Sequence, residues 1–222
     1  MALPVWAIVV AAGQGTRFGG PKQLEEIDGK TVLDHSMLAA RSSADGVVAV
    51  VAARYVGEEQ IASLADRVVA GAVTRAGSVR AGLAAVPEDA EVIVVHDAAR
   101  PLASRDLFEA VVSAVRDGAD GAIPGHPMVD TVKQAKEGIV VGTLDRAGLV
   151  RVETPQAYAA KVLRRAHESG AESTDDAALV EADGGRVVVV PGELWNLKIT
   201  TPDDLELARW WYERRRAAEV LR

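Results

Sequence analysis

Short apolar runs rich in β-branched residues recur along the chain. They occupy residues 5–11 (VWAIVVA), 47–52 (VVAVVA), 92–96 (VIVVH) and 187–190 (VVVV). A run of this length without polar alternation is typical of a strand that is buried on both faces, as in a parallel sheet covered by helices. We therefore expect these four segments to be strands of one buried sheet.

The stretches between and after these runs have the spacing of amphipathic helices. Helical patterns cover residues 32–41, 58–65, 78–86, 104–116 and 203–216. Ser78 and Ser104 open two of them and are expected to be N-caps, because a serine oxygen accepts a hydrogen bond from a backbone N–H of the first turn. The alternation of strand and helix predicts an α/β fold with a doubly wound, mostly parallel, Rossmann-like sheet flanked by helices.

The alternation breaks at about residues 126–150. Two short strands are expected there, at 128–133 and 139–144, with Gly138 and Gly142 as breaks in the pattern. A strand pair that interrupts an α/β domain often packs outside that domain, for example on a second subunit. We expect a protruding β-arm that contacts a second subunit, attached to a single domain spanning residues 1–222 with no second catalytic domain fused to it.

Composition narrows the class of protein. The 222 residues include 25 Lys and Arg against 32 Asp and Glu, for a net charge of −7, and no Cys. An acidic chain is not expected to bind nucleic acid, which needs a basic surface. No apolar run approaches the roughly 18–20 residues that cross a bilayer, and the N-terminus lacks the basic segment of a signal peptide. A cytoplasmic protein without disulfides or thiolate metal sites is expected.

A glycine-rich loop, AAGQGTRFGGPKQ, follows the first predicted strand. In an open α/β sheet, ligands bind beyond the carboxyl ends of the strands, so this loop has the position of a binding loop. Its glycines allow the backbone to approach a ligand closely and present N–H groups to oxyanions. Arg17 and Lys22 add two cations. The loop therefore favours a nucleoside triphosphate as ligand.

Two familiar phosphate-binding motifs do not fit this loop. A P-loop requires Gly-Lys-Ser/Thr, but Lys22 stands between Pro21 and Gln23. The dinucleotide fingerprint G-x-G-x-x-G begins correctly at Gly13, but Phe18 occupies its last position. These departures exclude a kinase-type ATP loop and argue against an NAD site.

The loop resembles the signature A-A-G-x-G-x-R-(x)n-P-K of the sugar-nucleotidyltransferase superfamily and, within it, the family of 2-C-methyl-D-erythritol 4-phosphate cytidylyltransferases. Further blocks of that family follow in order, and they are RAGSVRAGL (75–83), HDAARP (96–101), DTVK (130–133), Asp145-Arg146, TPQ (154–156), TDD (174–176) and NLKIT (196–200). One departure is Ala72, where the family commonly has the second glycine of a pair. The resemblance implies transfer of CMP from CTP to methylerythritol phosphate, with Mg²⁺ as cofactor and a homodimer formed through the β-arm.

The chemistry of such a transfer needs positive charge. A phosphate oxygen attacks the α-phosphorus of CTP in line and expels pyrophosphate, and since the nucleophile is already ionised, no strong base is required. Repulsion between anions must be overcome, for which cations and Mg²⁺ are suited. Arg17 and Lys22 are placed to hold the triphosphate. The resemblance assigns both a catalytic role and adds Lys198, which on sequence alone is equally a surface lysine.

The resemblance also names binding residues. The expected nucleotide-binding residues are Ala11, Ala12, Gly13, Gly15, Ala72, Ser78, Asp97 and Ala98. The expected acceptor-binding residues are Asp97, Arg100, Thr131, Arg146 and Thr154, of which Thr131 and Arg146 reach the partner's site from the arm. Asp97 is also a candidate Mg²⁺ ligand, with the ion held mainly by the CTP phosphates.

Several of these residues have purely structural alternatives. Asp97 follows a predicted strand and is also suited to cap a helix or turn, and Arg100 is also suited to an ion pair with Asp97. His96 is expected to be structural. Thr154 precedes a proline, where an extended turn residue is ordinary. The acidic pair of the TDD block suits a helix N-terminus.

Three alternative functions remain open on sequence. They are cytidylyl transfer to another polyol phosphate such as ribitol 5-phosphate, transfer from another nucleoside triphosphate, and non-catalytic nucleotide binding.

Overall fold

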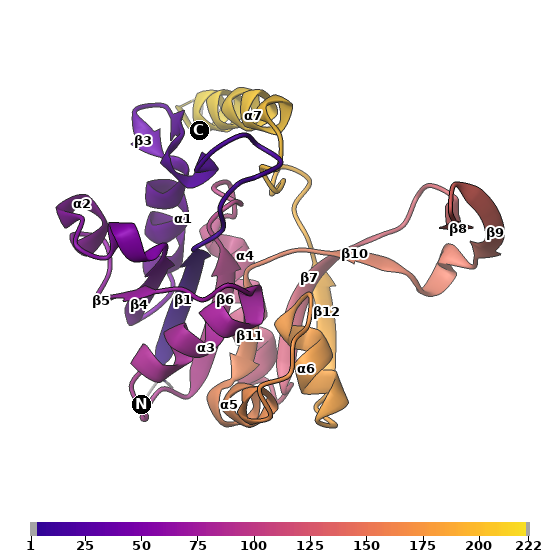
Figure 1. The fold of residues 1–222 in the computed structure, drawn as a ribbon, viewed down its shortest axis with the longest axis horizontal. Helices are drawn as coiled ribbons and strands as arrows, with labels where there is room; N and C mark the ends of the chain where they lie inside the picture. The colour runs from indigo at the N-terminus through magenta and orange to yellow at the C-terminus, as the bar shows by residue number, and fades with distance from the viewer. Residues whose placement is uncertain (1–3, 221–222) are drawn as a thin grey trace.

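A computed structural model describes residues 4–220 and shows one mixed, mostly parallel sheet covered by helices on both faces (Figure 1). The strand order is β10-β7-β11-β6-β1-β4-β5, and β12 pairs with β7. These strands are β1 (Val5–Ala11), β4 (Gly46–Val51), β5 (Arg67–Ala70), β6 (Val92–Asp97), β7 (Gly121–Pro127), β10 (Val150–Val152), β11 (Gln156–Ala159) and β12 (Val187–Pro191). β10 and β11 run antiparallel to their neighbours, and the other pairs are parallel.

The helices divide between the two faces of the sheet because successive strand residues point to opposite sides. Ala7 and Val9 of β1 share a core with Leu33 and Phe108, whereas Ile8 shares the opposite core with helices α3, α5 and α6. The helices are α1 (Val32–Arg41), α2 (Glu59–Ala62), α3 (Arg75–Ala85), α4 (Arg105–Arg116), α5 (Ala160–Glu168), α6 (Asp176–Ala182) and α7 (Pro202–Val220). The predicted doubly wound α/β fold is confirmed.

Local sequence explains where most helices begin. Ser104 caps α4 by accepting from Leu107 N, as predicted, and Thr31 forms a capping box with Asp34 at α1. The prediction for Ser78 was wrong. Helix α3 begins three residues earlier, because the Thr74 side chain accepts from Gly77 N and caps it there. Helix α2 is also shorter than the predicted 58–65.

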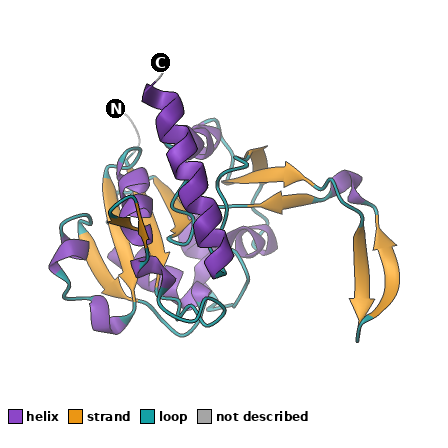
Figure 2. Cartoon of the chain, turned by 90° about the horizontal axis from the view of Figure 1, so that it is seen from above, coloured by secondary structure: helices purple, strands orange, loops and turns teal. Residues whose placement is uncertain are grey.

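A β-hairpin protrudes from the body between β7 and β10 (Figures 1 and 2). It consists of β8 (Val132–Lys136) and β9 (Ile139–Leu144), which pair antiparallel, followed by a 3₁₀ turn (Arg146–Gly148). The predicted arm is therefore present, although its first strand starts at Val132 instead of residue 128. Smaller pieces complete the chain and are β2 (Glu26–Ile27), β3 (Lys30–Thr31) and 3₁₀ turns at Lys22–Leu24 and Ala53–Tyr55.

Helix α7 lies across one end of the molecule, at the top of the view in Figure 1, close to the indigo segment that follows β1. Leu205 and Ala208 of α7 pack with Ile27, Val32 and Ile199 in a third apolar cluster. None of the helices within residues 4–220 is long and apolar enough to span a membrane.

Candidate nucleotide-binding site

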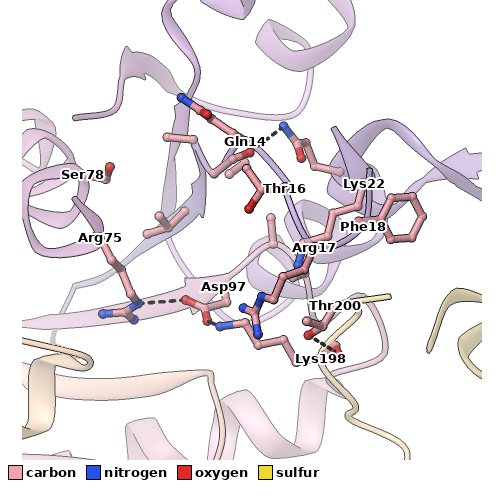
Figure 3. A pocket seen from close by; sticks show the side chains of 18 of the residues that line it. Gln14, Thr16, Arg17, Phe18, Lys22, Arg75, Ser78, Asp97, Lys198 and Thr200 are labelled. Atoms are coloured by element: carbon pink, nitrogen blue, oxygen red, sulfur yellow. Dashed lines mark hydrogen bonds and ion pairs between the residues drawn. The ribbon is translucent and has the colours of Figure 1, made fainter. Parts of the chain in front are cut away.

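A polar cavity of about 370 Å³ opens at the carboxyl edge of the sheet (Figure 3). Its walls come from the loop after β1, the segment before α3, the end of β6 and the segment that leads into α7. This is the position at which open α/β sheets bind ligands. The predicted nucleotide-binding residues Ala11, Ala12, Gly13, Gly15, Ala72, Ser78, Asp97 and Ala98 all line it.

The loop after β1 depends on a glycine at position 15. The N–H groups of Phe18 and Gly19 donate to Gly15 O at 2.9 and 3.0 Å, which folds the loop back over itself. Gly15 has a φ of +65°, and a Cβ there would lie 1.8 Å from Gly20 O. Any side chain at this position would therefore displace the loop backbone from the cavity.

The wall opposite this loop is fixed by Ser78. Its hydroxyl is buried, donates to Thr74 O at 2.9 Å and accepts from Ala72 N at 3.0 Å. A Cβ on Gly71 would lie 2.3 Å from Ala12 Cβ, so the two loops approach as closely as the missing side chain allows. Ser78 thus fixes the backbone conformation at Ala72, which lines the cavity.

Arg17, Lys22 and Lys198, the three predicted catalytic cations, line this one cavity although they come from distant parts of the chain (Figure 3). Lys22 Nζ donates to Ile199 O. Burial, together with the charges of Lys198 and Arg17, lowers the pKa of Lys22 from its ordinary value. Because these three cations lie close together, the cavity favours binding of a ligand with several negative charges.

Asp97 ends β6 and holds two cations. Its Oδ2 lies 2.5 Å from Lys198 Nζ, and its Oδ1 lies 3.2 Å from Arg75 Nε. Burial alone would raise the pKa of Asp97, but the charges of Arg75 and Lys198 outweigh it, and the pKa lies well below its usual value. Asp97 is therefore an anion at neutral pH, and it orients the cations of the pocket.

Arg75 is a site residue that the sequence reasoning did not single out. It lines the cavity and pairs with both Asp97 and Asp176. The available signal was its position at the head of the RAGSVRAGL block. The alternative of an ion pair between Asp97 and Arg100 is not what forms, because Arg100 Nη1 instead donates to Asn196 O at 2.7 Å.

The predicted acceptor-binding residues divide into two groups. Arg100 and Thr154 lie next to Asp97, and Thr154 Oγ1 accepts from Asp97 N at 3.0 Å. Thr131 and Arg146 belong to the arm, which projects away from the cavity of its own chain (Figure 1). Both are exposed, and the Arg146 guanidinium donates to Val129 O. The chain therefore does not bring all five residues together within one copy.

His96 is buried beneath this region and connects its parts. Its Nε2 lies 3.1 Å from Arg100 O, and because a carbonyl only accepts, Nε2 carries the proton. Nδ1 then accepts from the Thr154 hydroxyl at 3.2 Å. Burial lowers the pKa of His96 to about 4, so the ring is neutral at physiological pH.

The donor set for a metal is small. Within residues 4–220 no three His, Asp or Glu side chains cluster in a way that would hold a metal ion. Asp97 contributes one carboxylate, and both of its oxygens already face cations. These residues fit a Mg²⁺ ion whose remaining ligands are the oxygens of a nucleotide's phosphates, and they do not form a preformed cage.

Comparison with known proteins relates most of the chain to one enzyme family. Residues 5–214 match the family model described as 2-C-methyl-D-erythritol 4-phosphate cytidylyltransferase (IspD). A protein of that name from Rhodococcus opacus is 45% identical, with 93% of this chain and 94% of the relative covered, and one from Streptomyces avermitilis is 41% identical, with 95% and 92% covered.

A longer relative and a solved structure agree with these matches. A bifunctional IspD/IspF enzyme from Clavibacter michiganensis is 44% identical over 90% of this chain, which spans 52% of the length of that relative. The crystal structure of the cytidylyltransferase from Thermus thermophilus superposes with a TM-score of 0.79 at 32% identity, covering 93% of this chain and 98% of that one.

Proposed function

The chain belongs to the family of 2-C-methyl-D-erythritol 4-phosphate cytidylyltransferases, and on that premise we propose that its cavity transfers CMP from CTP to 2-C-methyl-D-erythritol 4-phosphate. The products are 4-diphosphocytidyl-2-C-methyl-D-erythritol and pyrophosphate. The observation that carries the proposal is the convergence of Arg17, Lys22 and Lys198 on one polar cavity beneath a glycine-rich loop. We also propose that the reaction takes place in the cytoplasm.

The loop after β1 is proposed to bind the triphosphate. Its backbone at Ala11, Ala12, Gly13 and Gly15 lines the cavity, where N–H groups suit phosphate oxygens. The base is proposed to lie against the Ala72 segment, which Ser78 holds in place. Asp97 and Ala98 close the floor.

In the proposed reaction an acceptor phosphate oxygen attacks the α-phosphorus of CTP. A new P–O bond forms as the bond from the α-phosphorus to the bridging oxygen of the β-phosphate breaks, and pyrophosphate leaves with the electron pair. Arg17, Lys22 and Lys198 stabilise the charge that develops on the transferring and leaving oxygens. Asp97 and the triphosphate oxygens would hold Mg²⁺, which would supply Lewis-acid stabilisation of the same charge.

The acceptor is proposed to bind between two copies of the chain. Arg100 and Asp97 face it from one copy, Thr154 acts by holding the Asp97 backbone, and Thr131 and Arg146 reach it from the arm of the other copy. The arm carries exposed apolar side chains, which are Val129, Ile139, Val140, Val141 and Leu144. An apolar surface of this kind on an isolated hairpin supports a protein–protein contact and hence a homodimer.

The reaction is tested by measuring pyrophosphate release with Mg²⁺. Each of the four nucleoside triphosphates is combined with methylerythritol phosphate and, separately, with ribitol 5-phosphate. We expect release only with CTP and methylerythritol phosphate. Release with ribitol 5-phosphate would assign a different acceptor to the same site, and a folded protein that released none would contradict the catalytic proposal.

The arm is tested by Arg146→Ala. We expect the KM for the acceptor to rise about tenfold or more with little change in the KM for CTP, because one hydrogen bond to a charged group contributes about 1.5–3 kcal/mol. Steady-state kinetics with each substrate varied in turn measure this split. Lys136→Ala, a change of an exposed cation on β8 of the same arm, is the matched control and should leave both constants unchanged.

Mixing variants shows whether the arm acts across the dimer. Arg146→Ala and Lys22→Ala subunits are each impaired alone, but a mixed dimer contains one pocket with intact cations and an intact partner arm. We expect such a mixture to regain part of the wild-type activity. Absence of recovery in an isolated mixed dimer would show that each copy completes its own site.

A further inference from the structure

A row of alternating charges runs from the cavity into the interior of the protein. Asp97 Oδ1 faces Arg75 Nε at 3.2 Å, and Arg75 Nη1 lies 2.8 Å from Asp176 Oδ2. Asp176 Oδ1 in turn lies 2.9 Å from His167 Nε2. Lys198, at 2.5 Å from Asp97 Oδ2, forms the other end of the row in the pocket. Figure 3 shows the pocket half, from Arg75 through Asp97 to Lys198.

The inner end of this row is far from solvent. The Asp176 and His167 side chains are 1% and 3% exposed, and Asp176 does not line the cavity. A carboxylate buried to this degree is costly unless it is paired. Burial alone would lower the pKa of Arg75, but the charges of Asp97 and Asp176 outweigh it and raise the pKa. The guanidinium is thus a fixed cation between two carboxylates.

Asp176 is not needed to start the helix on which it lies. The N-cap of α6 is Asp175, whose carboxylate accepts from Ala178 N at 3.1 Å. The two neighbouring acids therefore differ in role: Asp175 caps the helix, and Asp176 pairs with Arg75. Since these roles belong to adjacent residues of the same helix, they can be separated by substitution.

The side-chain hydrogen bond of His167 also supports a role of Asp176 in orienting Arg75. A carboxylate only accepts, so Nε2 donates to Asp176, while Nδ1 is buried without a hydrogen-bond partner within residues 4–220. Leaving a buried nitrogen unpartnered costs free energy. The contact that His167 does make is with Asp176, whose other oxygen then faces Arg75.

We propose that Asp176, oriented by His167, is a positioning residue that confines Arg75 to one oxygen of Asp97, Oδ1, and thereby fixes the ammonium group of Lys198 in the cavity. Arg75 Nη1 is anchored from behind by Asp176, which leaves Nε directed at Asp97 Oδ1 and frees Oδ2 for Lys198. Without the anchor, the guanidinium turns further onto Asp97 and competes with Lys198 for the same carboxylate. The inference rests on the proposed cytidylyl transfer.

The test is Asp176→Asn, which keeps the size of the side chain and one acceptor oxygen but removes the charge. We expect kcat to fall about tenfold, which corresponds to a rise of about 1.36 kcal/mol in the activation free energy. The KM for CTP should change less than twofold. His167→Gln, which retains a donor near the position of Nε2, should stay close to wild type, and His167→Leu should behave as Asp176→Asn does. Asp175→Ala is the matched control and should lower the unfolding temperature without changing kcat.

A double-substitution cycle separates positioning from stability. In an Arg75→Gln background, Asp176→Asn should cause no further loss of kcat, because the residue through which it acts is gone. An equal tenfold loss in that background, or an unchanged kcat in the single variant of an active enzyme, would overturn the inference. Crystal structures give a readout that is independent of turnover. A turn of Arg75 further onto Asp97 that displaces Lys198 in Asp176→Asn supports the proposal, and a Lys198 that keeps its position on Asp97 overturns it.

The wild-type protein is assayed beside the variants. An inactive wild type overturns the proposed function, whereas an active wild type with an unaffected Asp176→Asn variant overturns only the positioning role.

Discussion

Replacing Lys22 or Lys198 by alanine is expected to lower kcat for cytidylyl transfer by about 10²–10³-fold, the usual effect of removing one group that stabilises charge in a transition state. Both side chains line the cavity, from opposite ends of the sequence. Neither belongs to an apolar cluster of the core, so the fold should persist in both variants, with an unchanged circular dichroism spectrum.

The two lysines should differ in how they act. Lys22 donates to a backbone carbonyl, that of Ile199, and its lowered pKa reflects burial beside Lys198 and Arg17. An incoming triphosphate relieves this repulsion, so Lys22→Ala should also weaken binding of CTP. Lys198 is paired with Asp97 and should affect kcat more than the KM for CTP. Steady-state kinetics measure both constants, and Lys161→Ala, an exposed lysine on α5, is the control. Full activity in both lysine variants would rule out stabilisation by these cations.

The alternation of apolar runs and helical patterns was sufficient to predict the sheet because the central strands are buried on both faces. β1, β4 and β6 are almost entirely inaccessible and read as continuous apolar segments. β7 was not predicted, because its sequence, GAIPGHP, contains Pro124 and two glycines, which normally argue against an interior strand. Its place next to β11 and β12 is set by long-range pairing, which local patterns do not encode.

The pocket likewise contains residues that the local sequence predicts and residues that it does not. Residues of the loop after β1 could be recognised locally, because glycines, Arg17 and Lys22 lie within one short segment at a strand end. The contacts around Asp97 could not be recognised locally. Lys198 is 101 positions from Asp97, and Asp176 is 101 positions from Arg75. Ser78 was misread as an N-cap, because Thr74 competes for that role and the spacing of apolar residues does not distinguish the two.

Asp97→Asn is expected to destabilise the protein by about 3 kcal/mol at neutral pH, at the lower end of the range for removing one partner of a buried ion pair. The Asp97 side chain is 12% exposed and holds Arg75 and Lys198, and both cations lose their shared anion in the variant. The Lys198 side chain is 41% exposed and can return to water, which limits the cost. Urea unfolding of both proteins measures the difference, with Asp89→Asn as an exposed control.

The pH dependence of that difference identifies its origin. Burial opposes ionisation of Asp97, but the neighbouring cations outweigh it, so its folded-state pKa lies below the ordinary value of 3.8. A carboxylate of this kind contributes stability that is fully present above the unfolded pKa and is lost as the pH falls through the folded pKa. The gap between wild type and Asp97→Asn should therefore be constant near neutrality and shrink below pH 3.8. A gap that persisted undiminished into this acid range would mean that the carboxylate stabilises the protein by shape and hydrogen bonding instead of by its charge, and Asp97 would then lose its place as the anion that organises the cations of the pocket.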